Sequence, residues 1–82
     1  ETLYHILDSR AEALEFVIRE ESEVTGIPLM NLNLKNNLLI GCINRGGNIK
    51  IARGQDCIQQ GDTVIVLTSQ KGLRDIRDIL RK

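Results

Sequence analysis

Apolar residues gather in the middle of the chain, in short runs that polar turns separate. Residues 38–43 are almost continuously apolar, as is typical of a strand buried on both faces. The segment 44–48 (NRGGN) supplies residues that accept positive φ and predicts a tight hairpin. Ile49 and Ile51 then alternate with Lys50 on a returning strand, and residues 63–67 (TVIVL) form a third strand. The pattern predicts a compact three-stranded sheet.

Two further elements precede this sheet. The alternation in residues 14–18 (LEFVI) predicts a strand, and Val17 adds apolar character to its second face. This strand is therefore expected to be covered on both sides or to lie at an interface. Pro28 is tolerated in a first helical turn, so the apolar residues after it predict a helix of one to two turns from about Pro28 to Leu32. Met30 is expected to fill the core.

Both ends of the chain are predicted to be helical. Apolar positions 3, 6 and 7 form one short helical stripe, which indicates a docked leading helix over residues 1–7. Ser69 is a candidate N-cap for a final helix whose apolar stripe uses positions 73, 76 and 80. The predicted fold class is α+β, a two-layer sandwich of β-α-β-β-β-α order with a short leading helix. Residues 1–10 form the leading helix and linker, and residues 11–82 form the domain.

Composition and charge remove several classes of function. The chain has 82 residues, which suits one small domain, and its 11 basic and 11 acidic residues cancel. Because the net charge is zero, the chain has no overall electrostatic field that would attract nucleic acid. Its one Tyr and one Phe offer no platform on which bases could stack. No apolar run approaches the about 20 residues that span a bilayer, so direct membrane insertion is not expected. Because the chain opens at Glu1, it is expected to be part of a longer protein.

The candidate chemical groups are few and scattered. Cys42 and Cys57 lack metal-ligand spacing, and two unpaired thiols fit a reducing cytosol, with Cys42 expected to be a small buried hydrophobe. The Gly46–Gly47 pair is no phosphate cradle, because no helix follows it. Asp62 precedes a strand, so it is interpreted as a turn residue that caps backbone N–H groups. His5 has no nucleophile joined to it, and we expect no enzyme.

Four segments in order, ALEFVI, TGIPLMNLNL, LLIGCINRGGNIKIARGQD and GDTVIVLT, resemble the TrkA C-terminal domain family, also called RCK_C. The resemblance covers residues 11–80. Its landmarks are Gly26 with Leu29 and Leu32, Ile43-x-Arg45 before the hairpin, and Gly61-Asp62 before the last strand. The lead-in over residues 1–16 resembles the segment that joins a nucleotide-binding Rossmann half to this domain. The resemblance implies a ligand-sensing, dimerising regulatory module for potassium transport.

This resemblance also implies partners and a place in the cell. We expect a homodimer in the cytoplasm, peripheral to the inner face of the cell membrane, that controls a separate membrane potassium transporter subunit through the full-length protein. NAD or ATP is expected only on the Rossmann half, whose glycine fingerprint this sequence lacks, so no cofactor is expected here. Cyclic di-AMP, which some members bind at the dimer interface, is the candidate ligand.

The family's ligand positions fall on five residues of this chain. They are Lys35, Asn37, Leu39, Ile51 and Arg53. Lys35 and Arg53 can pair with phosphate, and Leu39 and Ile51 can flank a purine. Two departures from the family pattern are Ala52, where members often have proline, and Lys35, where cyclic-di-AMP binders tend to have arginine. The alternative interpretation is a purely structural dimerisation domain with no ligand, in which these charges are ordinary loop residues.

Overall fold

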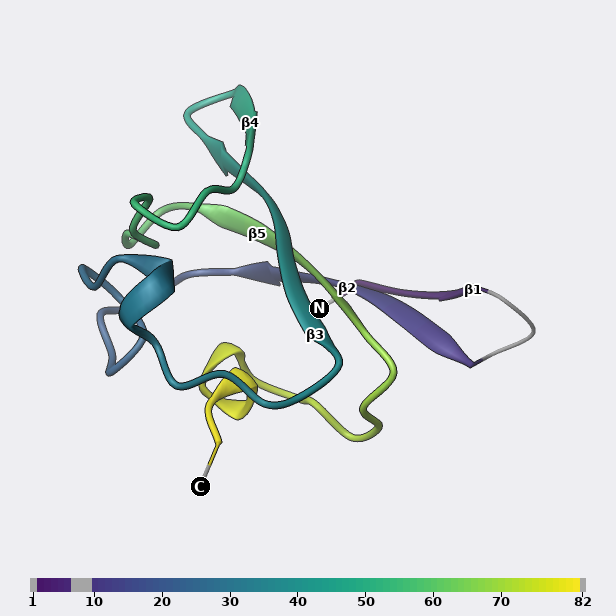
Figure 1. Ribbon diagram of the computed structural model, residues 1–82. Coiled ribbons are helices and arrows are strands. Elements are labelled where there is room, and N and C mark those ends of the chain that lie inside the picture. Colours follow the sequence, from purple (N-terminus) through teal and green to yellow (C-terminus); the bar gives the residue numbers. More distant parts are fainter. Residues whose placement is uncertain (1, 7–9, 82) are drawn as a thin grey trace.

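The computed structural model describes residues 2–6 and 10–81, which form a five-stranded antiparallel sheet of order β1-β2-β5-β3-β4 (Figure 1). The strands are β1 (Thr2–Ile6), β2 (Ala11–Val17), β3 (Leu38–Arg45), β4 (Asn48–Ile51) and β5 (Thr63–Thr68). Two short 3₁₀ helices, η1 (Leu29–Asn31) and η2 (Ile76–Ile79), complete the described elements. The arrangement is α+β-like with little helix, so the predicted β-α-β-β-β-α order is not observed.

The predicted leading helix is wrong where the structure describes it, over Thr2–Ile6. This segment is an edge strand that pairs with β2, in a register running from Thr2 opposite Glu15 to Ile6 opposite Ala11. An isolated helix of one or two turns is unstable in water because nucleation fixes several residues for one hydrogen bond. Pairing with the neighbouring strand β2 instead provides hydrogen-bond partners for the backbone N–H and C=O groups of this segment. Residues 1 and 7 of the predicted helix lie outside the described residues.

The predicted final helix is replaced by an extended segment and the single turn η2. Gly72 has φ of 82°, which is incompatible with a continuous helix from Ser69. The helical turn starts later, where Asp75 accepts a hydrogen bond from the Arg77 backbone N–H and Asp78 completes a capping box. Apolar residues in this segment are individually buried against the sheet, and this tertiary packing overrides the helical spacing.

The middle of the chain follows the prediction more closely. The helix predicted over 28–32 is a shorter 3₁₀ turn, which ends because Leu32 has an extended backbone with φ of −81° and ψ of 138°. The N–H groups of Leu29 and Met30, which have no acceptor inside the turn, donate to the carbonyls of Asp56 and Gly54. The strands predicted over 14–18, 38–43 and 63–67 correspond to β2, β3 and β5, except that β2 ends at Val17 and Ile18 lies just after it. The tight hairpin is confirmed, since Gly46 and Gly47 have φ of 59° and 88° between β3 and β4.

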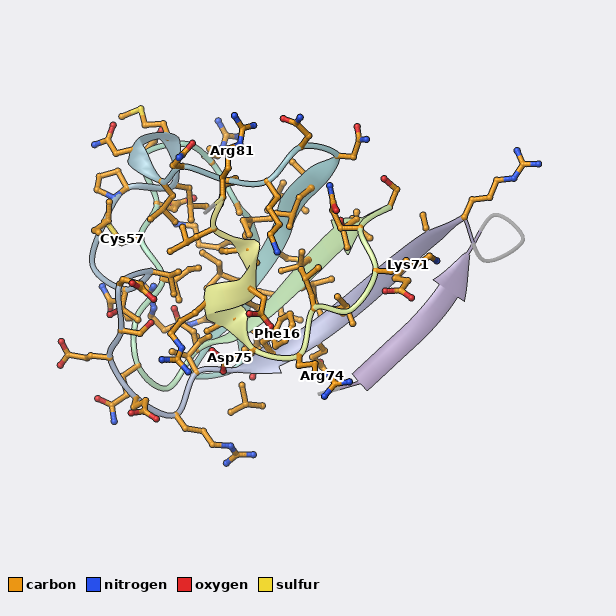
Figure 2. The ribbon with its side chains drawn as sticks, turned by 90° about the horizontal axis from the view of Figure 1, so that it is seen from below. Phe16, Cys57, Lys71, Arg74, Asp75 and Arg81 are labelled. Atoms are coloured by element: carbon orange, nitrogen blue, oxygen red, sulfur yellow. The ribbon has the colours of Figure 1, made fainter. Side chains whose placement is uncertain are left out.

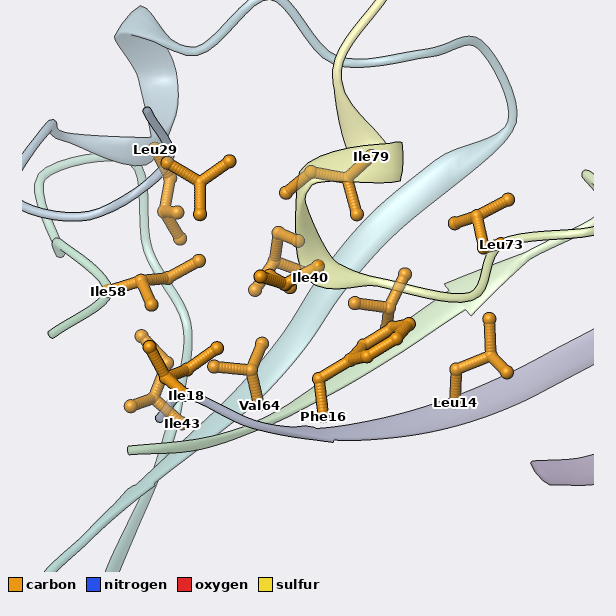
Figure 3. Packing of buried hydrophobic residues seen from close by; sticks show 13 residues of the cluster. Leu14, Phe16, Ile18, Leu29, Ile40, Ile43, Ile58, Val64, Leu73 and Ile79 are labelled. Carbon is orange, nitrogen blue, oxygen red and sulfur yellow. The ribbon is translucent and has the colours of Figure 1, made fainter. Parts of the chain in front are cut away.

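The hydrophobic core lies on one face of the sheet (Figure 3). Inward-facing side chains of β2, β5 and β3 meet apolar residues from the connecting segments and both 3₁₀ helices. The sheet contributes Leu14, Phe16, Ile40, Ile43, Val64 and Val66; the segments outside the strands contribute Ile18, Val24, Leu29, Ile58, Leu73, Ile76 and Ile79. Loops and single turns therefore form the second layer.

The expectation that β3 is buried on both faces is wrong. A β-bulge at Gly41 directs both Ile40 and Ile43 into the core, while Leu39 is 60% exposed and Cys42 is half-buried. Val17, expected to be covered or at an interface, is 48% exposed in this chain. One face of the sheet thus carries the core, and the other is open.

Candidate functional site

A shallow apolar groove lies between η1, the first half of β3 and the segment after β4. Its volume is about 200 Å³, and its walls include Leu29, Met30, Leu38, Leu39, Ala52 and Arg53. Complete small-molecule pockets usually exceed about 300 Å³. On its own this chain therefore offers part of a binding site.

Backbone hydrogen bonds hold the two walls together. The Met30 N–H donates to the Gly54 carbonyl at 2.9 Å, and the Leu29 N–H donates to the Asp56 carbonyl at 2.8 Å. Gly54 allows this close approach, because a Cβ at that position would lie 3.2 Å from Cβ of Met30. The Met30 side chain is 70% exposed at the rim, so its predicted role as core filler is wrong.

Arg53 brings positive charge to this groove. Its backbone N–H donates to Oδ2 of Asp56 at 2.7 Å, and Oδ1 of the same carboxylate accepts from Nζ of Lys50 at 2.9 Å. The hydrogen bond from Lys50 and that from the Arg53 backbone lower the pKa of Asp56. Within the described residues, no side-chain partner engages the Arg53 guanidinium, which leaves it available to an anion.

The structure brings together two of the five predicted ligand residues, Leu39 and Arg53, which both line the groove. The other three lie outside its lining. Lys35 donates its backbone N–H to the Ile79 carbonyl, and Asn37 adopts φ of 56° while its carbonyl accepts from Thr68 and Ser69. Ile51 is 73% exposed on β4.

Sequence reasoning missed Met30 and Gly54 as parts of the groove. The spacing of Met30 resembles that of its buried neighbours, and nothing local shows that η1 ends after one turn. Gly54 carried a findable signal, since a glycine in a polar loop often marks close backbone approach.

The Asp62 carboxylate has a structural role in joining two turns to the sheet. It is 1% exposed and accepts from Nε and Nη2 of Arg45 at 2.8 and 2.9 Å, and from the Gln59 N–H at 2.8 Å. Arg45 also donates to the Cys57 carbonyl. The prediction that Asp62 caps turn N–H groups is confirmed. The hydrogen bond from Arg45 lowers the pKa of Asp62 despite its burial.

A second groove of about 230 Å³ runs between the end of β2 and the segment before η2. Figure 2 shows Arg74 and Asp75 near Phe16 on this side of the molecule. Its rim mixes acidic Glu20 and Glu21 with basic residues, and Arg77 pairs with Asp75 at 2.7 Å. This balance of charge favours no ligand class.

Neither metal ligation nor membrane crossing is indicated over the described ranges. No cluster of three or more His, Cys, Asp or Glu side chains there could hold a metal ion. Among the helices described, none has the length and apolar character to cross a bilayer.

The described residues form a small antiparallel-sheet domain with one packed face, one open face and an apolar groove beside Arg53. The TrkA-C domain family model matches residues 13–81, and the chain belongs to this family. It is 34% identical over 73 residues to a Trk system potassium uptake protein TrkA homolog of Pyrococcus abyssi, covering 88% of this chain and 32% of that protein.

Other relatives carry similar names. The same identity and coverage hold for the TrkA homolog of Pyrococcus horikoshii. TrkA homolog 1 of Methanosarcina mazei is 29% identical over 76 residues, which cover 93% of this chain and 17% of the relative. The chain therefore spans about a third or less of the length of these curated relatives.

Proposed function

We propose that this domain is the regulatory, ligand-sensing and dimerising part of a Trk-type potassium uptake system. It acts in the cytoplasm at the inner face of the membrane and controls transport through a separate membrane subunit. Family membership and the names of the relatives support the link to potassium uptake. The observation that carries ligand sensing is the apolar groove with the unengaged guanidinium of Arg53 at its wall.

The groove suits a ligand that combines a planar apolar group with an anion. Leu39 and Met30 can contact a purine, and Arg53 can form charge-assisted hydrogen bonds to a phosphate. Cyclic di-AMP has this chemistry and is the ligand that we propose. NAD or ATP belongs to a Rossmann half outside this sequence, and this domain needs no cofactor of its own.

Leu39 belongs both to the proposed ligand site and to the proposed dimer surface. This residue lines the groove and also lies on the open sheet face that carries Ile51, so a second copy on that face would border the groove. A ligand held there would favour whichever dimer arrangement it contacts better, and it can shift the equilibrium only by that difference in affinity. Lys35 and Asn37 remain candidates for contacts in the assembled site.

Isothermal titration of the chain with cyclic di-AMP tests this proposal. We expect saturable binding at one ligand per dimer, weakened about 100-fold or more in Arg53→Ala, because each of the two copies loses a charge-assisted contact of about 1.5–3 kcal/mol. Arg74→Ala is the control, because Arg74 is also an exposed arginine but does not line this groove. This variant should bind as the wild type does. Absence of heat at high ligand concentration, with Arg53→Ala and wild type alike, would reject ligand sensing by this domain.

A purely structural dimerisation module is the second candidate function. The exposed apolar side chains of the open sheet face favour it, because they need a partner surface whether or not a ligand binds. It predicts a stable dimer in sedimentation that shows no response to cyclic di-AMP.

A further inference from the structure

Asp56 ends the short turn, residues 53–56, that brings Arg53 to the wall of the groove. Its side chain is 13% exposed, and each of its two carboxylate oxygens accepts one hydrogen bond. Oδ2 accepts from the Arg53 N–H at 2.7 Å, and Oδ1 accepts from Nζ of Lys50 at 2.9 Å. The Asp56 N–H in turn donates to the Arg53 carbonyl at 3.0 Å. These reciprocal bonds hold the turn at both of its ends.

Two neighbouring elements anchor this turn, one on each side. The bond from Lys50 joins it to β4, the edge strand that ends two residues before Arg53. From the other side, η1 donates two backbone N–H groups to carbonyls of the turn, at 2.8 and 2.9 Å. The backbone that carries Arg53 is therefore fixed between the two walls of the groove.

The side chain of Arg53 differs from its backbone in this respect. Arg53 is exposed, and no side-chain partner among the described residues engages its guanidinium. Lys50 is a neighbouring cation, but Asp56 already pairs with its charge. A phosphate in the groove would therefore meet a free cation on a fixed backbone. Such preorganisation strengthens binding, because less conformational freedom is lost when the ligand arrives.

We propose that Asp56 is a positioning residue of the ligand site, whose carboxylate fixes the turn 53–56 so that Arg53 is held at the groove wall before a phosphate binds. This deepens the proposed ligand sensing and rests on it. Asp56 does not line the groove, so it acts through Arg53 and does not touch the ligand. Pairing with Lys50 also offsets the negative charge that would otherwise repel a phosphate.

Isothermal titration of the chain with cyclic di-AMP tests this role in three variants. Asp56→Ala removes both acceptors and should weaken binding about 10-fold, because binding then has to order the turn in each copy. Asp56→Asn keeps an oxygen for the Arg53 N–H and should recover most of that loss. Asp75→Ala is the matched control, since this carboxylate also accepts a backbone N–H and pairs with an arginine but lies outside the groove. The control should bind as the wild type does.

A double-mutant cycle separates the positioning of Arg53 from a general effect on the structure. Asp56→Ala combined with Arg53→Ala should bind no more weakly than Arg53→Ala alone, because no guanidinium is left to position. Titration followed by NMR chemical shifts extends the measurement to these weak variants. If Asp56→Ala weakens binding by the same factor with and without Arg53, the positioning role is overturned.

Lys50→Met guards against loss of folding in Asp56→Ala, since Lys50 is an exposed residue on edge strand β4. This variant releases the carboxylate from β4 and should weaken binding about 3-fold, again only while Arg53 is present. Circular dichroism checks that each variant is folded.

The outcomes separate this inference from the proposal on which it rests. A wild type that binds cyclic di-AMP no more tightly than Asp56→Ala would overturn positioning by Asp56 and leave ligand sensing intact. Binding by Asp56→Asn as weak as that by Asp56→Ala would overturn the hydrogen bond to the Arg53 N–H as its means. A wild type that gives no heat would reject ligand sensing itself, and with it any role of Asp56 in the site.

Discussion

The Arg45–Asp62 ion pair joins the end of β3 to the turn before β5. Asp62 is buried, and the Arg45 guanidinium reaches it with two nitrogens while its own stem remains partly exposed. Two sequence landmarks, Ile43-x-Arg45 and Gly61-Asp62, are thus the two halves of one contact. The contact fixes the loop that precedes the central strand β5.

Replacing Asp62 by asparagine should lower the free energy of unfolding by about 2–3 kcal/mol, because hydrogen bonds to a charged group are lost and the new amide N–H₂ faces a donor. The matched control is Asp75→Asn, which breaks an ion pair between side chains that are 52% and 58% exposed. Surface pairs contribute less than about 1 kcal/mol. Urea unfolding of both variants measures the difference; equal losses would contradict the structural weight given to Asp62.

Acid should weaken this same contact. The pKa of Asp62 is lowered from its ordinary value of 3.8, chiefly by the hydrogen bond from Arg45, so the folded state binds this proton less readily than the unfolded state. The stability it contributes is present above the unfolded pKa and is lost as pH falls through the folded pKa. The gap in unfolding free energy between wild type and Asp62→Asn should therefore be constant near neutrality and shrink below about pH 4. A gap that widens in acid would refute this assignment.

Strand β3 shows what one inserted residue does to an element. Strict alternation from Leu38 would place Ile40 and Cys42 on one face and Leu39 and Ile43 on the other. The bulge shifts the register between Ile40 and Cys42, so Ile40 and Ile43 both face the core. The same shift sends Cys42 to the open face of the sheet, opposite Ile65 and Ile51.

Glycines in this strand and its hairpin should differ in their tolerance of alanine. Gly47 has φ of 88°, a conformation that is strained for a residue with a Cβ, so Gly47→Ala should cost about 1–2 kcal/mol. Gly41 has no positive φ, and a Cβ there would meet Ile65 O at an ordinary 3.5 Å. Gly41→Ala should therefore be nearly neutral. Thermal unfolding of the two variants compares them, and the reverse ranking would contradict the turn geometry.

At the scale of the whole molecule, single turns and loops perform the covering role usually given to helices. Ile76 and Ile79 of η2 are buried against the sheet, and backbone hydrogen bonds from Lys35 to Ile79 and from Arg81 to Asn33 hold this terminal segment in place. With few helical hydrogen bonds available, side-chain packing has to hold this layer on the sheet.

Truncating Ile79, which is fully buried, to alanine should lower the free energy of unfolding by about 2–5 kcal/mol. Ile27→Ala removes the same atoms at a partly exposed loop position and should cost less than about 1 kcal/mol. Chemical denaturation measures both. A small loss for Ile79→Ala would show that the terminal segment is not part of the cooperative core.

The sequence by itself determined the strands and turns of the middle of the chain, because alternating or continuous apolar runs and glycine-tipped turns are local signals. It also determined that Asp62 caps a turn, and the family's residue pattern identified the TrkA-C domain.

Tertiary structure decided the rest. Positions 3, 6 and 7 suggested a helix, yet pairing with β2 made a strand of Thr2–Ile6, since a short helix gains too little alone. Burial of Leu73, Ile76 and Ile79 against the sheet decided the last segment. The groove joins Leu39 to Arg53 only after β4 returns beside β3, so sequence could name these two residues through resemblance but could not exclude Ile51 from the lining. Local physics sets which residues form strands and turns; packing between distant segments sets which of them share a surface.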